Sequence, residues 1–299
     1  MSELRVLSPT AILGYGFPLS SFEAGLARDP HVIAVDAGST DPGPYYLGAG
    51  KCFTQRAAVK RDLHFLVDAA LKRGIPLIIG TAGGSGARPH VDWTVAIVNE
   101  VLADLQAAAK LAVIYSDIDR DLLVQELRRG RIQPLGPVAD LTEEQIQTSS
   151  HIVAQMGLEP IVQALKEGAQ IIIAGRAYDP TAFAALPVLM GCDLALALHM
   201  GKILECAAIA ASPGSGSDCL FGYLYDDCFV LEALNPQRRC TKLSVAAHTL
   251  YEKSDPYWLP GPGGTLDLRQ CTFEELEGGR VKVSGTRFVP TEKYFLKLE

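Results

Sequence analysis

The sequence predicts an α/β fold in which a mostly parallel sheet is flanked by helices and followed by a β-rich C-terminal region. In the first two thirds of the chain, short runs that are apolar throughout alternate with longer amphipathic stretches. Strands buried on both faces of a parallel sheet have this composition, and helices cover such a sheet. Further on, paired strand-like runs around turn residues replace the alternation. We therefore expect an α/β region over residues 1–212 and a hairpin region over 213–299, packed on the same core.

The strand-like runs of the α/β region each end in a polar or glycine-bearing loop. They cover residues 5–7, 32–35, 76–79, 111–115 and 170–174. Helical patterns lie between them, over residues 57–73, 91–109, 120–129 and 142–167. The last pattern is broken near Gly157 and Pro160, which favours two helices.

Two hairpins are predicted in the C-terminal region. Residues 220–225 and 229–234 flank two aspartates, and residues 273–276 and 280–284 flank two glycines. The proline- and aromatic-rich stretch 256–264 lies between the hairpins. We interpret it as a rigid loop that covers a pocket, makes a subunit contact or only connects the two hairpins.

Composition narrows the classes of partner. The chain has 299 residues, is 48% hydrophobic and carries a net charge of −7 without a basic patch, which argues against nucleic acid. No signal peptide is visible, and charged residues interrupt the longest apolar stretch, 195–211, so no membrane span is expected. Seven cysteines without a CxxC pair suit a reducing cytoplasm. We expect small-molecule partners.

A glycine-rich loop follows the third strand-like run and precedes a helical pattern. Its residues Gly83, Gly84, Ser85 and Gly86 could present backbone N–H groups to a phosphate or a carboxylate. The Gly-Lys-Ser/Thr ending of a P-loop and the G-x-G-x-x-G spacing are both missing. The alternative is that the glycines only let the loop turn and the helix pack closely on the sheet.

Polar residues also follow other strands, and ligands of α/β sheets bind beyond the carboxyl ends of the strands. These candidates are Asp36, Ser39, Thr40, Asp41, Arg176 and Asp179. For any single aspartate the alternative is a helix cap or a turn. Their clustering at successive strand ends nevertheless predicts a site.

The helix expected over residues 195–211 is apolar except for a few ionisable residues. His199, Lys202 and Cys206 fall on one face, and Glu205 lies within pairing distance of Lys202. Buried ionisable groups shift their pKa values and can serve as acids or bases. The alternative is a satisfied Lys–Glu pair that fixes the helix in place.

Further candidates follow this helix. Ser215, Ser217 and Asp218 belong to a second glycine-serine loop. There is no G-x-S-x-G elbow for serine-hydrolase chemistry, and no base can be placed beside a cysteine nucleophile. His248 and Glu252 could share a metal, but the third ligand is unidentified, so we assign no metal site.

Several segments spread over almost the whole chain carry a resemblance to a known family. They are LSPTAILGYGFP, IAVDAGSTDPGPYYLG, AAVKRDL, IIGTAGGSGA, IVAQMG, AGRAYDP, LHMGKILECAAIAASPGSGSD and AHTLYEKSDPYWLPGPGG. The set is similar to the acyclic terpene utilisation family, the AtuA-like proteins. The resemblance implies a role in bacterial breakdown of citronellol- and geraniol-type terpenoids, but assigns neither a reaction nor functional residues. Members usually continue into a small ferredoxin-like domain, whereas this sequence ends at Lys297-Leu298-Glu299. We therefore expect either that a small partner protein supplies that part or that the segment is deleted.

We expect an enzyme, a lyase or hydratase, that acts on a small carboxylate or an acyl-coenzyme A ester without a redox cofactor. Coenzyme A would enter only as part of the substrate, and a homo-oligomer is expected. The catalytic candidates are Lys202, Glu205, His199, Asp36, Asp41, Asp179 and Asp218. The anion-binding candidates are Gly83, Gly84, Ser85, Gly86, Ser39, Thr40, Arg176, Ser215 and Ser217. The alternative function is a non-catalytic subunit or scaffold of an acyl-coenzyme A complex.

Overall fold

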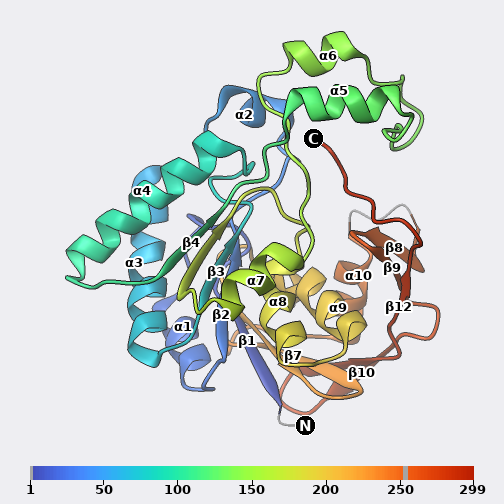
Figure 1. Cartoon of the computed structure of the whole chain (residues 1–299). Coiled ribbons are helices and arrows are strands. Elements are labelled where there is room, and N and C mark those ends of the chain that lie inside the picture. The colour runs from blue at the N-terminus through green and yellow to red at the C-terminus, as the bar shows by residue number, and fades with distance from the viewer. Residues whose placement is uncertain (1–2, 252–254) are drawn as a thin grey trace.

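A computed structural model describes residues 3–251 and 255–299, and it confirms the predicted α/β class (Figure 1). Within these described residues, the main sheet has nine strands in the order β10-β11-β7-β6-β1-β2-β3-β5-β4. Its strands are β1 (Leu4–Ser8), β2 (Val32–Asp36), β3 (Leu77–Gly80), β4 (Leu111–Ile114), β5 (Ile171–Ala174), β6 (Leu220–Leu224), β7 (Cys228–Ala233), β10 (Thr272–Leu276) and β11 (Arg280–Ser284).

The strands β1, β2, β3, β5 and β4 are parallel to one another. Every residue of β2, β3 and β5 is buried, because helices cover both faces of this half of the sheet. Asp36, the last residue of β2, is in register with Gly80, the last residue of β3. The carboxyl ends of these strands therefore meet at one edge of the sheet.

The C-terminal strands extend the same sheet with antiparallel pairs. The two predicted hairpins form as β6–β7 and β10–β11, and β6 pairs with β1 across five residues. The prediction of a loop over residues 256–264 is wrong. β8 (Trp258–Gly261) and β9 (Gly264–Asp267) form a hairpin that pairs with β12 (Arg287–Pro290) in a second sheet. Pro260 fits there because β8 is an edge strand, where no N–H need be donated.

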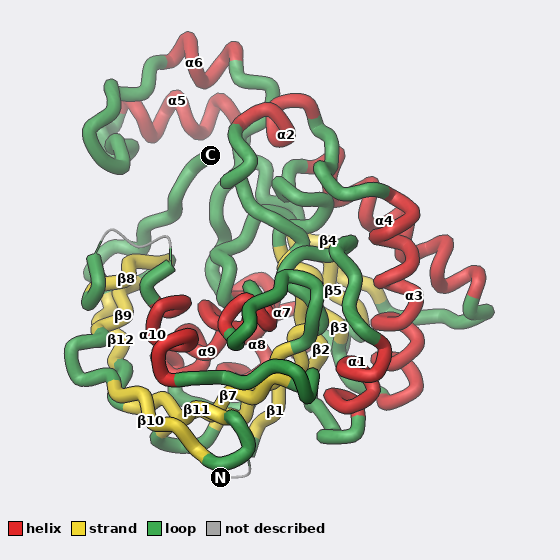
Figure 2. Tube along the Cα trace, turned by 180° about the vertical axis from the view of Figure 1, so that it is seen from behind, coloured by secondary structure: helices red, strands yellow, loops and turns green. Residues whose placement is uncertain are grey.

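Helices form a layer on each side of the parallel strands (Figures 1 and 2). On one face lie α1 (Leu19–Leu26), α3 (Arg56–Arg73) and α4 (Arg88–Asp104), and on the other lie α7 (Glu159–Lys166), α8 (Thr181–Leu189) and α9 (Leu194–Leu204). The remaining helices are α2 (Pro44–Ala49), α5 (Arg120–Arg128), α6 (Glu143–Thr148) and α10 (Lys242–Thr249), with a short 3₁₀ helix at Ala207–Ala210. None of the described helices is long and apolar enough to cross a membrane.

Each face of the sheet has its own apolar core. Alternate residues of one strand serve both cores, as Ile79 packs toward α3 and α4 while Ile78 packs toward α8 and α9. Leu259 and Leu266 of the small sheet join the α8–α9 core. The small sheet is therefore fastened to the main body by apolar packing.

The helix α9 carries two of the predicted catalytic residues, His199 and Lys202, and a third, Glu205, directly follows its last residue. The Asp193 side chain caps its start by accepting the N–H of Leu196 at 2.9 Å. At its end, the hydroxyl of Ser8 donates to the carbonyl of Leu204 at 2.6 Å. The helix end is thereby fixed at the carboxyl end of β1, beside the strand ends described above.

Candidate functional site

A buried cluster of charged side chains lies where the strand ends meet α9. Lys202 is fully buried, and Asp36, Arg176 and Glu205 expose 6% of their surface or less. Asp179 joins them from the loop after β5. All five are candidates named from the sequence, and they come from three separate segments: the end of β2, the loop after β5 and the end of α9.

The closest pair in the cluster is Lys202 and Glu205. The Lys202 ammonium donates to Oε1 of Glu205 at 2.5 Å and lies 3.9 Å from Oδ2 of Asp179. Burial lowers the pKa of Lys202, but the charges of Glu205 and Asp179 outweigh burial and the pKa is raised. Lys202 therefore stays a cation inside the protein.

Two carboxyl groups of the cluster have raised pKa values. Burial, reinforced by Asp179, raises the pKa of Glu205 to about 7 against the opposing effect of Lys202. Burial also raises the pKa of Asp36 well above its ordinary value, and the charges of Asp179 and Glu205 add to it. Glu205 therefore exchanges its proton near neutral pH, and Asp36 holds its proton above the pH at which an ordinary aspartate ionises, as catalytic bases and acids do.

Arg176 fixes the loop that carries Asp179. Its guanidinium donates to Oδ1 of Asp179 at 3.1 Å, to the Thr81 hydroxyl at 3.3 Å and to the carbonyl of Ala177 at 3.0 Å. Its remaining N–H groups meet the Glu299 carboxylate, with Nε donating at 2.7 Å. Every nitrogen of the Arg176 guanidinium therefore has an acceptor, so the side chain is held in one orientation. In that orientation it fixes the position of the Asp179 carboxylate.

Two residues beside the cluster have left-handed backbone conformations that non-glycine residues rarely adopt. Thr81 follows β3 with φ +45°, and Ala207 follows Cys206 with φ +46°. Each conformation costs about 1–3 kcal/mol, and such strain is concentrated at functional sites. Both residues are fully buried, so the surrounding packing holds them there.

A comparison with family models matches residues 53–215 to the acyclic terpene utilisation family, described as protein AtuA. The chain belongs to this family. Its role is accordingly in the utilisation of acyclic terpenes. The part matched to the AtuA family contains Arg176, Asp179, Lys202 and Glu205, whereas Asp36 lies before it. Searches of curated proteins and of solved structures each gave no match.

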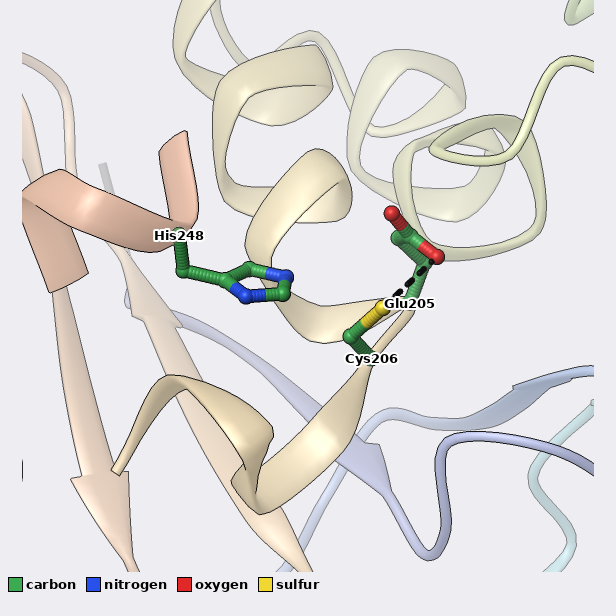
Figure 3. A group of neighbouring side chains, drawn as sticks. All are labelled: Glu205, Cys206 and His248. Atoms are coloured by element: carbon green, nitrogen blue, oxygen red, sulfur yellow. Dashed lines mark hydrogen bonds between the residues drawn. The ribbon is translucent and has the colours of Figure 1, made fainter. Parts of the chain in front are cut away.

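Cys206 and His248 adjoin the cluster in this AtuA-family chain. Glu205, Cys206 and His248 are the one group among the described residues that could hold a metal ion, with ligand atoms all within 4.8 Å. Figure 3 shows the imidazole of His248, from α10, directed toward the sulfur of Cys206. The Nε2 atom of His248 is buried without a hydrogen-bond partner among the described residues.

The Glu205 carboxylate is already engaged by donors on both oxygens. Oε1 accepts from Lys202 and Oε2 accepts from the thiol of Cys206 at 3.3 Å, the bond dashed in Figure 3. A metal ion shared with Cys206 and His248 would replace the thiol proton at Oε2 and would lie near the positive charge of Lys202 on Oε1, which favours an acid–base role for Glu205. The other metal pair considered, His248 with Glu252, cannot be placed because Glu252 lies outside the described residues.

His199 makes its contacts away from the charged pair of its own helix. Its ring bonds to the Thr286 hydroxyl at 2.7 Å and to the Thr249 hydroxyl at 3.0 Å, and it packs edge-on against Phe229. Complete burial lowers the pKa of His199 to about 3. This geometry favours a neutral core histidine over an acid–base catalyst.

The other predicted catalytic acids do not contact the cluster. Asp41 is exposed, and its N–H donates to the hydroxyl of Ser39 at 3.2 Å within the loop that also contains Thr40. Asp218 is buried but accepts from Arg238 at 2.8 Å and from Asn235 at 2.7 Å. Asp218 therefore ties the loop before β6 to the segment after β7.

The second glycine-serine loop is held by hydrogen bonds of its own. The N–H of Ser215 donates to the carbonyl of Ala208, and the N–H of Ser217 donates to the Ser215 hydroxyl at 3.2 Å. The geometry thus gives both serines a role in shaping the loop, and their anion-binding role stays a prediction.

The glycine-rich loop after β3 is buried by neighbouring loops. The N–H groups of Gly84 and Gly86 already donate to Thr81 and Ala82. A Cβ on Gly86 would lie 2.1 Å from the nitrogen of Arg176, and one on Gly83 would lie 2.5 Å from the carbonyl of His90. Ser85 is 1% exposed. This geometry favours close packing as the role of the glycines, and anion binding stays a prediction.

Three neighbours of the cluster escaped sequence reasoning: Thr81, Tyr178 and Glu299. Thr81 lies between the predicted strand and the glycines, and Tyr178 lies beside Asp179. Their positions at strand ends were a usable signal. Glu299 reaches Arg176 only because residues 297–299 pair with residues 153–155, a contact far apart in sequence.

Proposed function

We propose that this AtuA-family chain is an acid–base enzyme that eliminates or adds water next to the carbonyl of an acyclic terpenoid carboxylate or its acyl-coenzyme A ester. One observation carries the proposal: two buried carboxyl groups with raised pKa values, Asp36 and Glu205, interact through their charges, and Glu205 is bonded to a buried cation, Lys202. General acid–base chemistry needs a proton acceptor and a donor poised near the working pH.

In elimination, the carboxylate of Glu205 accepts the proton from the carbon next to the carbonyl, and that C–H bond breaks. The Lys202 ammonium stabilises the negative charge that develops on the carbonyl oxygen. The C–O bond to the hydroxyl group then breaks, Asp36 donates its proton to that oxygen, and water leaves. Hydration follows the same steps in reverse.

Support for these roles comes from the environments of the two carboxyl groups. Glu205 contacts Lys202 directly, which keeps its pKa near neutrality despite burial. Asp36 has Thr81 and the charge of Arg176 beside it, but burial and two carboxylates still raise its pKa. Environments that differ in this way assign one group as base and the other as acid.

The test is turnover of hydroxylated and unsaturated acyclic terpenoid acids and their coenzyme A esters, followed by loss or gain of water. We expect Glu205→Gln and Asp36→Asn each to lower kcat/KM by about 10²–10⁴-fold. Asp41→Asn is the matched control, because it makes the same change on an exposed carboxylate. Full turnover by Glu205→Gln would overturn the proposal.

A further inference from the structure

An apolar cavity of about 240 Å³ opens between α7, α8, α9 and the small sheet. Its walls include Leu158, Leu194, Leu198, Pro262 and Phe288, so hydrocarbon surface dominates. The volume is below the 300–1,000 Å³ of drug-sized ligand pockets, which suits a short chain better than a ring system with substituents.

One stripe of α9 leads from this cavity to the charged cluster. Leu194, Leu198 and Lys202 follow at intervals of four residues and therefore lie on the same face of the helix. Four residues span about 6 Å of helix rise, so the Lys202 backbone lies about one turn beyond the cavity wall. A chain seated against the two leucines would reach the ammonium with its acyl end.

Tyr178 links the two places from the opposite side. Its ring lines the cavity, while the next residue in the chain, Asp179, belongs to the cluster. A Cβ on Gly261 would lie 2.7 Å from this ring, so the backbone of β8 presses directly on the tyrosine. The ring is thus held in place on the side of the cavity where the chain continues to Asp179.

Part of the cavity lining is polar. The hydroxyl of Tyr294 donates to Oε2 of Glu159 at 2.9 Å, and both residues line the cavity. Tyr294 is 51% exposed, so this pair forms the mouth toward solvent. The cavity therefore has a polar pair at its exposed side and apolar walls, and two of its lining residues, Tyr178 and Leu198, adjoin the charged cluster through Asp179 and Lys202.

We propose that this cavity binds the branched hydrocarbon chain of an acyclic isoprenoid acid or acyl ester, with the acyl end at Lys202. The inference rests on the proposed function and names its chain-binding subsite. The side chains of Leu198 and Phe288 set the length and width of the chain that fits.

The test uses saturated, unreactive carboxylates, both straight and methyl-branched, of increasing chain length, with binding measured by calorimetry. In the unaltered chain we expect affinity to rise by about tenfold or more for each added methylene until the cavity is full, and then to level off. Leu198→Phe fills the cavity, so affinity levels off at a shorter chain. Phe288→Leu enlarges it, so affinity levels off at a longer one.

Leu122→Phe is the control, because it makes the same substitution at an exposed position on α5 and should leave the series unchanged. The inference would be overturned if affinity did not change with chain length. It would also be overturned if affinity levelled off at the same chain length in Leu198→Phe and Phe288→Leu. Because these ligands undergo no reaction, the outcome is independent of turnover. If affinity depends on chain length but no hydratase activity is found, the proposed function alone is wrong. If hydratase activity is found but affinity does not depend on chain length, the subsite alone is wrong.

Discussion

At the scale of single residues, the buried Lys202–Glu205 pair dominates the energetics of the site. Removing one partner of a buried pair costs about 3–5 kcal/mol, whereas replacing both is often nearly neutral. We expect Lys202→Met to lose stability in that range and Lys202→Met combined with Glu205→Gln to recover most of it. Urea unfolding measures both.

The loss in Lys202→Met should also depend on pH. Without the cation, the pKa of Glu205 rises further above its unfolded value. A carboxyl group with a raised pKa supports folding below its unfolded pKa and loses that support as pH rises, so the deficit is larger at pH 8 than at pH 5. Lys60→Met, which removes a surface pair with Asp104, is the control and should change little. An equal loss in both single variants would contradict the prediction.

The pH dependence of turnover follows from the same groups. Glu205 must be ionised to accept a proton, so kcat/KM should rise with pH through about 7. Asp36 must hold its proton to donate it, so kcat/KM should fall again at higher pH. The profile of kcat/KM measures both limbs, and Asp36→Asn should remove the high-pH limb. A profile flat from pH 5 to 9 would refute the assignment.

His199 makes the fold sensitive to acid. Its pKa is about 3 in the folded state, and an unfolded histidine has about 6.5. The unfolded state therefore binds the proton first, and stability falls as pH drops below 6.5. We expect this residue to account for roughly 2–3 kcal/mol of the loss between pH 6.5 and 4.5. The free energy of unfolding of His199→Gln should therefore decline less steeply with falling pH across that range. The same slope as in the unaltered chain would rule this role out.

At the scale of elements, the glycine-rich loop determines how closely two strand ends approach. Gly86 has φ +74°, and a Cβ there would meet the backbone nitrogen of Arg176 at 2.1 Å. Gly86→Ala should therefore push the Arg176 loop outward and cost about 3 kcal/mol or more. Gly130→Ala is the matched control, because Gly130 has a similar φ of +66° but open space around it. Thermal unfolding measures the loss of stability in each variant. Equal losses would show that backbone strain, and not the contact with Arg176, causes the loss in Gly86→Ala.

Some boundaries of helices and strands can be predicted from the local hydrophobic pattern, and others cannot. The run 32–35 and the strand Val32–Asp36 agree within a residue, because burial on both faces is visible as an unbroken apolar run. The helix predicted over 91–109 begins at Arg88 and ends at Asp104. Pro89 is tolerated in its first turn, and Gln106, with φ +52°, ends the helical path. Both are backbone effects that hydrophobic periodicity does not contain.

The site was predictable to the extent that its residues are close in sequence or at strand ends. Lys202 and Glu205 are three residues apart, so helical spacing alone brings them together. The orientation of His199 depends on Thr286, 87 residues further along the chain. His248 likewise reaches Cys206 only through the packing of α10. Contacts of this kind depend on tertiary packing, which no local pattern records.

At the scale of the whole molecule, the question is whether the two regions fold as one unit. Pairing of β6 with β1 makes the C-terminal strands part of the main sheet, and Leu259 and Leu266 bury the small sheet against the α8–α9 core. Residues on both sides of position 212 therefore share one apolar core. A shared core makes unfolding cooperative, because neither part can lose its packing without exposing the other.

The two tryptophans can test this cooperativity, because they report on different parts of the fold. Trp93 lies on α4 and Trp258 begins β8 of the small sheet. In Trp93→Phe and Trp258→Phe the remaining tryptophan follows one part alone during urea unfolding. We expect both fluorescence transitions to coincide with the loss of far-UV circular dichroism, after correction for the stability of each variant. A small-sheet transition at clearly lower urea would show that residues beyond 212 unfold as a separate unit. The apolar contacts of Leu259 and Leu266 would then be too weak to couple the small sheet to the core.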